Sequence, residues 1–124
     1  MTGTVLIVED TEPCRDTLEV ALMRVPGLAV RSVATAEEAL QYLATDEVCA
    51  LVTDLHLPQM DGFELIRAIR SRPRGASLPI LVISGDNDPR TMARLAGLGA
   101  DAYFSKPYSP AEVRQKLEQL LNGN

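Results

Sequence analysis

The chain has 124 residues and a formal net charge of −5, and 46% of its residues are hydrophobic. This length predicts one domain with a proper core, and the composition is ordinary for a soluble globular protein. The acidic balance argues against direct nucleic-acid binding, because phosphate contacts need a basic face. The sequence has no apolar run as long as a membrane span and no basic N-terminal segment of a signal peptide. We therefore expect a cytoplasmic protein that does not bind membranes.

The two cysteines and the single histidine limit metal and redox chemistry. Cys14 and Cys49 lie far apart and form no metal-ligand pattern. We expect them to be small buried hydrophobes with reduced thiols. The chain has one histidine, His56, and no cluster of cysteines, so it offers too few ligands for a zinc site.

Five short apolar runs alternate with helical patterns along the chain. The runs predict strands at residues 4–8, 28–34, 48–53, 79–84 and 102–105. The second run contains Arg31 and Ser32, so we expect this strand near an edge of the sheet. Regular alternation with short connections predicts one α/β domain over residues 1–124, with helices on both sides of a parallel sheet.

Apolar residues at helical spacing predict five helices between and after the strands. Thr35 with Glu38 and Ser109 with Glu112 predict capping boxes at two helix starts. Asp61 and Asp88 are the expected N-caps of two others. The helix at about residues 88–97 has the weakest apolar stripe.

Polar residues follow four of the predicted strands. Strand one ends in Glu9 and Asp10, strand three in Asp54 and strand four in Ser84, and Lys106 follows strand five. Strand two offers no ionic residue at its end. If these side chains form one site, the strand order is 2-1-3-4-5, a flavodoxin-like doubly wound sheet with its switch point between strands one and three.

Together these residues suggest a specific chemistry, although Asp54 alone is equally well explained as a cap. Three clustered carboxylates repel one another unless a cation joins them, and Mg²⁺ prefers carboxylate, water and phosphate oxygens. A lysine and a hydroxyl supply donors for the other oxygens of a phosphoryl group. A carboxylate is also a nucleophile that forms an aspartyl phosphate. The residues therefore predict Mg²⁺-assisted phosphoryl transfer to an aspartate.

Four motifs carry a resemblance to a known family. They are Val8-Glu9-Asp10, the segment Asp54…Pro58-Gln-Met-Asp61-Gly62, Ile83-Ser84-Gly85, and Gly99-Ala-Asp101-Ala-Tyr103-Phe-Ser-Lys106-Pro107. In this order and spacing the chain resembles a response-regulator receiver domain of two-component signalling from end to end.

The resemblance implies a role for each acidic residue. Asp54 is the expected phosphoacceptor, and Asp10 and Glu9 are expected to hold Mg²⁺ directly or through water. The backbone carbonyl of His56 is a further expected metal ligand. Glu9 departs from the aspartate of many members, and its longer side chain still reaches a metal through water. The His56 side chain either overhangs the phosphoryl group and influences the attacking water, or it is an exposed loop imidazole without consequence.

The resemblance also implies the residues of a switch. Ser84 and Lys106 are expected to contact the phosphoryl oxygens, and Tyr103 is the expected aromatic rotamer switch. Ser84 replaces the commoner threonine, which keeps the hydroxyl but loses a methyl that restrains its rotamer. The Lys106–Pro107 bond is expected to be cis.

As a receiver domain, the protein is expected to be a signalling switch and not an enzyme, although it assists its own phosphotransfer and autodephosphorylation. A sensor histidine kinase or phosphotransfer protein donates to Asp54, and the surface of the fourth helix, fifth strand and fifth helix then changes for a protein partner. This surface would include Arg94, Tyr103 and Arg114. We expect a monomer or a phosphorylation-dependent dimer, acting alone or as a module of a longer or hybrid chain, with no output domain after the fifth helix.

Two other classes of protein share parts of this pattern. A phosphohydrolase of the haloacid-dehalogenase type also uses a strand-end aspartyl nucleophile and Mg²⁺, but it has a second acid where this chain has His56. A flavin-binding flavodoxin-like module is disfavoured, because an anionic crevice repels the flavin phosphate.

Overall fold

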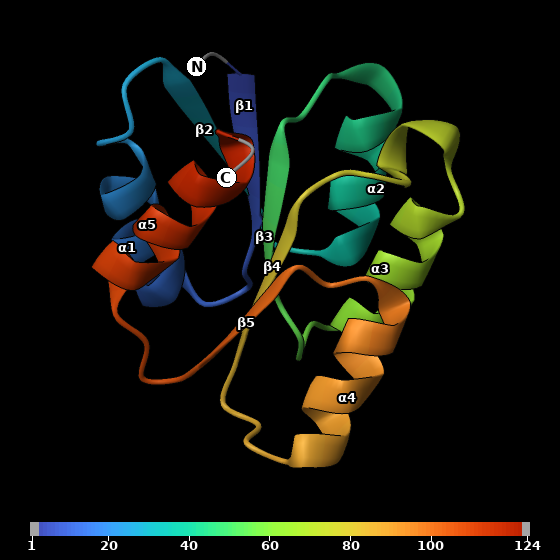
Figure 1. Cartoon of the computed structure of the whole chain (residues 1–124). Coiled ribbons are helices and arrows are strands. Elements are labelled where there is room, and N and C mark those ends of the chain that lie inside the picture. Colours follow the sequence, from blue (N-terminus) through green and yellow to red (C-terminus); the bar gives the residue numbers. More distant parts are fainter. Residues whose placement is uncertain (1–2, 123–124) are drawn as a thin grey trace.

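A computed structural model describes residues 3–122, which form a five-stranded parallel sheet between two layers of helices (Figure 1). The strands are β1 (Gly3–Val8), β2 (Leu28–Val33), β3 (Ala50–Asp54), β4 (Ile80–Ser84) and β5 (Ala102–Ser105). The helices are α1 (Glu12–Leu22), α2 (Ala36–Thr45), α3 (Gly62–Arg70), α4 (Pro89–Leu98) and α5 (Pro110–Leu121), with a 3₁₀ turn η1 (Pro73–Gly75) that was not predicted. The strand order β2-β1-β3-β4-β5 confirms the predicted topology. Within the described range no helix combines the length and apolar character that a membrane crossing needs.

Alternate side chains of the central strands build two separate cores. Val5 and Ile7 of β1 pack with α1 and α5 on one face of the sheet, whereas Leu6 and Val8 pack with α2, α3 and α4 on the other (Figure 1). All four side chains are fully buried. Burial of each such side chain contributes roughly 1.5–3 kcal/mol, so the sheet is the rigid support of the strand ends. The polar strand β2 lies at an edge, as predicted.

Hydrogen-bonding side chains start four of the helices. Asp61 accepts the backbone N–H of Glu64, and the Glu64 carboxylate accepts the N–H of Asp61 in return, so α3 has a full capping box. Thr35 and Ser109 accept the N–H of the third helical residue. Among the described helices, the reciprocal bond from the N-cap backbone N–H to the glutamate side chain forms at α3. The prediction of complete capping boxes at Thr35 and Ser109 was therefore wrong, because each makes the first hydrogen bond of the box but not the second. Asp88 caps α4 as predicted.

The cysteines are less buried than the sequence suggested. Cys14 lies in the first turn of α1 and Cys49 directly before β3, and both are free thiols. Each is half-buried, so the expectation of full burial was wrong. A Cβ at Gly3 would lie 3.0 Å from the Cys49 sulfur, which shows how closely the start of β1 covers this side chain.

Candidate functional site

Asp54 lies at the carboxyl end of the central strand β3 and is only 6% exposed. One carboxylate oxygen, Oδ1, accepts the backbone N–H of His56 at 3.1 Å. The other, Oδ2, accepts a hydrogen bond from the Lys106 ammonium at 2.9 Å. The buried carboxylate is thus held from both sides by donors on the loops that follow β3 and β5.

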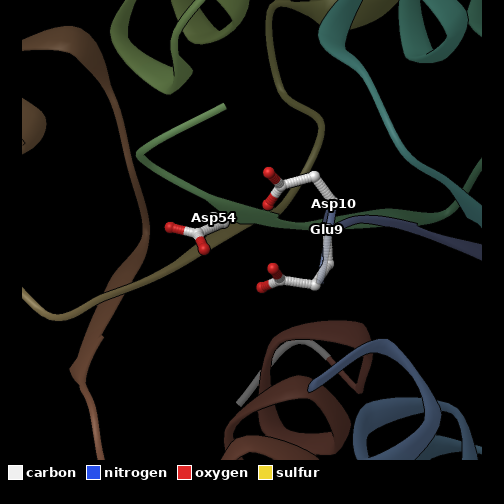
Figure 2. Close-up of side chains that lie close together, drawn as sticks. All are labelled: Glu9, Asp10 and Asp54. Atoms are coloured by element: carbon white, nitrogen blue, oxygen red, sulfur yellow. The ribbon is translucent and has the colours of Figure 1, made fainter. Parts of the chain in front are cut away.

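Three carboxylates converge on one space at this edge of the sheet. Figure 2 shows Glu9 and Asp10 at the end of β1 and Asp54 from β3, with their carboxyl groups facing a shared space. A carboxylate oxygen from each residue lies within 4.8 Å of the others. Glu9 is buried, whereas Asp10 is exposed at the mouth of the site. β1 and β3 are paired neighbours, which is why acids from distant parts of the chain meet here.

The charges in this cluster do not balance without a further cation besides Lys106. Lys106 lies 2.9 Å from Asp54 and 3.5 Å from Glu9, but one ammonium faces three carboxylates. Although burial disfavours the charged ammonium, its bond to Asp54 and the nearby carboxylates raise the pKa of Lys106. Burial raises the pKa of Glu9, and the charge of Asp54 adds to the rise. An all-oxygen donor set with excess negative charge fits a hard divalent cation such as Mg²⁺.

Backbone contacts fix the position of Glu9. Its Oε1 accepts the N–H of Thr11 at 3.1 Å, and the Arg15 guanidinium donates to its backbone carbonyl at 3.1 Å. The contact of Arg15 is not predictable from the sequence, because an arginine in the first turns of a helix carries no signal of a contact with the preceding strand. These bonds hold the acidic end of β1 against the start of α1.

The end of β4 places Ser84 next to the acidic cluster. Ser84 is fully buried, and its backbone carbonyl accepts the N–H of Lys106 at 2.8 Å. Its hydroxyl oxygen accepts the N–H of Asp86 at 3.1 Å. Lys106 is therefore fixed at both its backbone and its side chain.

A glycine lets α3 start close behind β3. A Cβ at Gly62 would lie 2.8 Å from the Leu55 Cα and 2.9 Å from the Asp54 carbonyl oxygen, closer than real Cβ contacts. The N–H of Gly62 donates to the Leu55 carbonyl at 2.8 Å. The chain can therefore turn from β3 into α3 without displacing the carboxyl end of the strand.

The family is decided by a match that covers almost the whole chain. The family model for the response regulator receiver domain matches residues 5–118. The chain belongs to this family. The haloacid-dehalogenase and flavodoxin alternatives are therefore not favoured.

Relatives of this receiver domain are also response regulators. It is 37% identical over 118 residues to the transcriptional regulatory protein GltR of Pseudomonas aeruginosa, covering 95% of this chain and 48% of GltR. It is 32% identical to the two-component response regulator ORR13 of Oryza sativa, covering 94% of this chain and 96% of that protein. The chain thus spans about half the length of some curated relatives, including GltR.

Solved structures agree with the fold. A response regulator receiver protein from Pseudomonas putida superposes with a TM-score of 0.83 at 32% identity, covering 100% of this chain and 98% of that one. The chemotaxis response regulator CheY4 of Vibrio cholerae gives 0.86 at 26% identity, with 98% and 99% coverage.

Several of the receiver residues predicted from the sequence lie together. Glu9, Asp10, Asp54 and Lys106 share one cluster. The Lys106–Pro107 bond is cis, which confirms that prediction. The imidazole of His56 is exposed, and its backbone N–H, not considered from the sequence, binds Asp54. The chemical roles of these residues stay predictions.

Tyr103 of β5 is partly exposed, but its hydroxyl is buried. Within residues 3–122 this hydroxyl has no hydrogen-bond partner by distance and angle. Burial raises the pKa of Tyr103, and the nearby Ser84 side chain offsets part of the rise. The role of Tyr103 as a rotamer switch stays a prediction.

Proposed function

We propose that this receiver domain is a phosphorylation-activated switch in which Asp54 accepts a phosphoryl group from a phosphohistidine. The donor is a sensor histidine kinase or a phosphotransfer protein in the cytoplasm. The observation that carries the proposal is the buried Asp54 carboxylate with Lys106 at 2.9 Å and two further acids around a shared space. This arrangement supplies a nucleophile, a fixed cation and a site for a divalent metal.

The phosphoryl transfer needs few protein groups. A carboxylate oxygen of Asp54 attacks phosphorus, the P–N bond to the donor imidazole breaks, and the imidazole leaves as a neutral ring after taking up a proton. Lys106 and the Ser84 hydroxyl then donate to the phosphoryl oxygens. Mg²⁺, held by Asp54, Asp10, Glu9 and the His56 carbonyl, would neutralise charge on those oxygens. Hydrolysis of the acyl phosphate returns the domain to its resting state.

Asp10 should contribute more to metal binding than Glu9. Glu9 already uses Oε1 to accept the Thr11 N–H, and its Oε2 lies 3.5 Å from Lys106. Asp10 is exposed and open to a hydrated ion. Calorimetric titration with Mg²⁺ should therefore show a larger loss of affinity for Asp10→Ala than for Glu9→Ala. The reverse order would make Glu9 the direct ligand.

The surface of α4, β5 and α5 is the proposed output face, because α4 is weakly held. Leu95 is the one buried residue of α4. Tyr103 belongs to this surface, and its buried hydroxyl lies near the Ser84 side chain. Arg94, expected on this face, instead stacks its guanidinium 3.8 Å from the centre of the Phe63 ring on α3. The output face therefore includes Tyr103 and Arg114, with Arg94 at its border with α3.

One experiment tests the proposal directly. The protein is incubated with Mg²⁺ and acetyl phosphate, and intact mass spectrometry follows the addition of a single phosphoryl group. Asp54→Asn should remain folded and unlabelled, and Lys106→Ala should label more slowly. Undiminished labelling of Asp54→Asn would overturn the assignment.

A further inference from the structure

The loop between β4 and α4 contains a continuous series of hydrogen bonds. The Asp86 N–H donates to the Ser84 hydroxyl oxygen at 3.1 Å. The Asp86 carboxylate in turn accepts the N–H of Asp88 at 2.8 Å and the hydroxyl of Thr91 at 2.9 Å. Thr91 lies in the first turn of α4. Ser84 is thus connected to α4 by one residue, Asp86, whose backbone binds the strand end and whose side chain binds the helix.

The carboxylate of Asp86 is well suited to this connection. It accepts two hydrogen bonds, from the Asp88 amide and the Thr91 hydroxyl, and these hold the pKa of Asp86 below its ordinary value. The group therefore stays ionised, and a charged acceptor makes stronger hydrogen bonds than a neutral one. A displacement of the Asp86 backbone is transmitted to Thr91 as long as that side-chain bond persists.

The opposite end of α4 is held by a different helix. Arg70, the last residue of α3, donates to the Gly99 carbonyl at 2.7 Å and to the Asp101 carboxylate at 3.3 Å. Asp101 also accepts the N–H of Ile80 at 2.8 Å. Gly99 has φ of 96°, a left-handed conformation that favours glycine, and a Cβ there would lie 2.9 Å from the Arg70 Nε. The C-terminal end of α4 is therefore anchored to α3 and β4.

We propose that Thr91 is a positioning residue that couples the Ser84 hydroxyl to the N-terminal turn of α4 through Asp86, while Arg70 keeps the C-terminal end in place. When the Ser84 hydroxyl turns toward the phosphoryl group, the Asp86 amide follows and shifts the first turn of the helix. This coupling rests on the proposed phosphorylation of Asp54 and goes beyond it, because it names the residues that transmit the change and the end of α4 that moves.

The test uses Thr91→Val, which removes the hydroxyl but keeps the branched shape, and Thr91→Ser, which restores the hydroxyl. Amide exchange of residues 89–98 is measured with and without Mg²⁺ and beryllofluoride, a phosphoryl mimic. In the resting state, exchange near residues 90–92 should be about 2- to 10-fold faster in Thr91→Val, the change that one hydrogen bond supplies. The response to the mimic should be lost in that variant and retained in Thr91→Ser.

A matched control removes a comparable hydroxyl elsewhere. Thr17 on α1 donates to the Pro13 carbonyl at 2.9 Å, far from the β4–α4 loop in the sequence, and Thr17→Val should respond like the unmodified protein. All these variants should accept a phosphoryl group to the same extent, since neither threonine lies in the acidic cluster.

Each outcome separates the two proposals. A normal response of Thr91→Val, or an equal response at both ends of α4, would overturn the coupling while leaving phosphorylation of Asp54 intact. Absence of labelling in the unmodified protein would instead overturn the proposed function.

Discussion

Helices α3 and α4 lie side by side on the same face of the sheet, yet they are held in different ways (Figure 1). Both begin with an aspartate cap, Asp61 in α3 and Asp88 in α4. The nine residues of α3 include four that are buried, namely Gly62, Leu65, Ile66 and Ile69. The ten residues of α4 include one, Leu95.

This difference shows that similar local signals lead to different stability. A cap fixes where a helix starts, but burial of an apolar face provides most of the free energy that holds it to the domain. We therefore expect α3 to unfold only with the whole domain and α4 to open locally at low free-energy cost. A helix that must move during switching belongs to the second kind.

The largest expected effect comes from shortening a core side chain in each helix. Ile66→Ala, at a fully buried position, should lower the free energy of unfolding by about 2–5 kcal/mol in urea titrations. Leu95→Ala should lower it less, because the loss is limited to the free energy that docks α4, and amide exchange should accelerate mainly in that helix. An exposed control in α4, Met92→Ala, should stay within about 0.5 kcal/mol. Equal losses for Ile66→Ala and Leu95→Ala would show that α4 unfolds with the rest.

A second comparison places the same substitution in both helices. Gly62→Ala puts a methyl group 2.8 Å from the Leu55 Cα, so it should destabilise the domain by about 1–3 kcal/mol and slow labelling of Asp54. Gly97→Ala is the matched control, because nothing lies within 4 Å of its added Cβ. There the methyl group should stabilise the helix by roughly 0.5–1 kcal/mol. Thermal unfolding of both variants measures the contrast, and a loss of stability in Gly97→Ala would contradict it.

Removing the cap of α3 should have a smaller effect. Asp61→Ala removes the carboxylate that accepts the Glu64 N–H, although the backbone N–H of residue 61 can still donate to Glu64, and it should reduce the global free energy of unfolding by about 1 kcal/mol. Asp61→Asn, which keeps an acceptor at the cap, should recover most of it. Asp88→Ala, in contrast, should speed amide exchange in the first turn of α4 and leave the urea midpoint nearly unchanged. A clear shift of the midpoint by Asp88→Ala would refute local opening.

The smallest effect should come from the stack of Arg94 on Phe63. Arg94→Gln removes a contact between α4 and α3 that is worth roughly 0.5–1 kcal/mol at an exposed site. Amide exchange in α4 should become faster, while exchange in α3 stays the same. Arg90→Gln is the control, since Arg90 pairs with Asp88 within the start of α4 and does not reach α3 in the described contacts. Faster exchange in both variants would mean that charge, not the stack, is responsible.

The amino-acid sequence determined the five strands and five helices, the order of the strands in the sheet and the members of the acidic cluster. Apolar runs such as residues 4–8 and 79–84 form strands that are buried on both faces of the sheet. An unbroken run of apolar residues in the sequence is enough to predict such a strand. The strand order followed from where charges occur, since Glu9, Asp10 and Asp54 meet only if β1 and β3 are neighbours. The caps at Thr35, Asp61 and Ser109 are contacts between residues three apart, so sequence spacing suffices to predict them.

Only the tertiary structure decided which residue each long side chain contacts. The stack of Arg94 on Phe63, the bonds of Arg70 to Gly99 and Asp101, and the Arg15 contact with Glu9 join different elements. An arginine has many rotamers and reaches several neighbours, so its partner depends on how the helices pack. The burial of the Tyr103 hydroxyl also depends on tertiary structure, because it lies near Ser84 only when β5 pairs with β4.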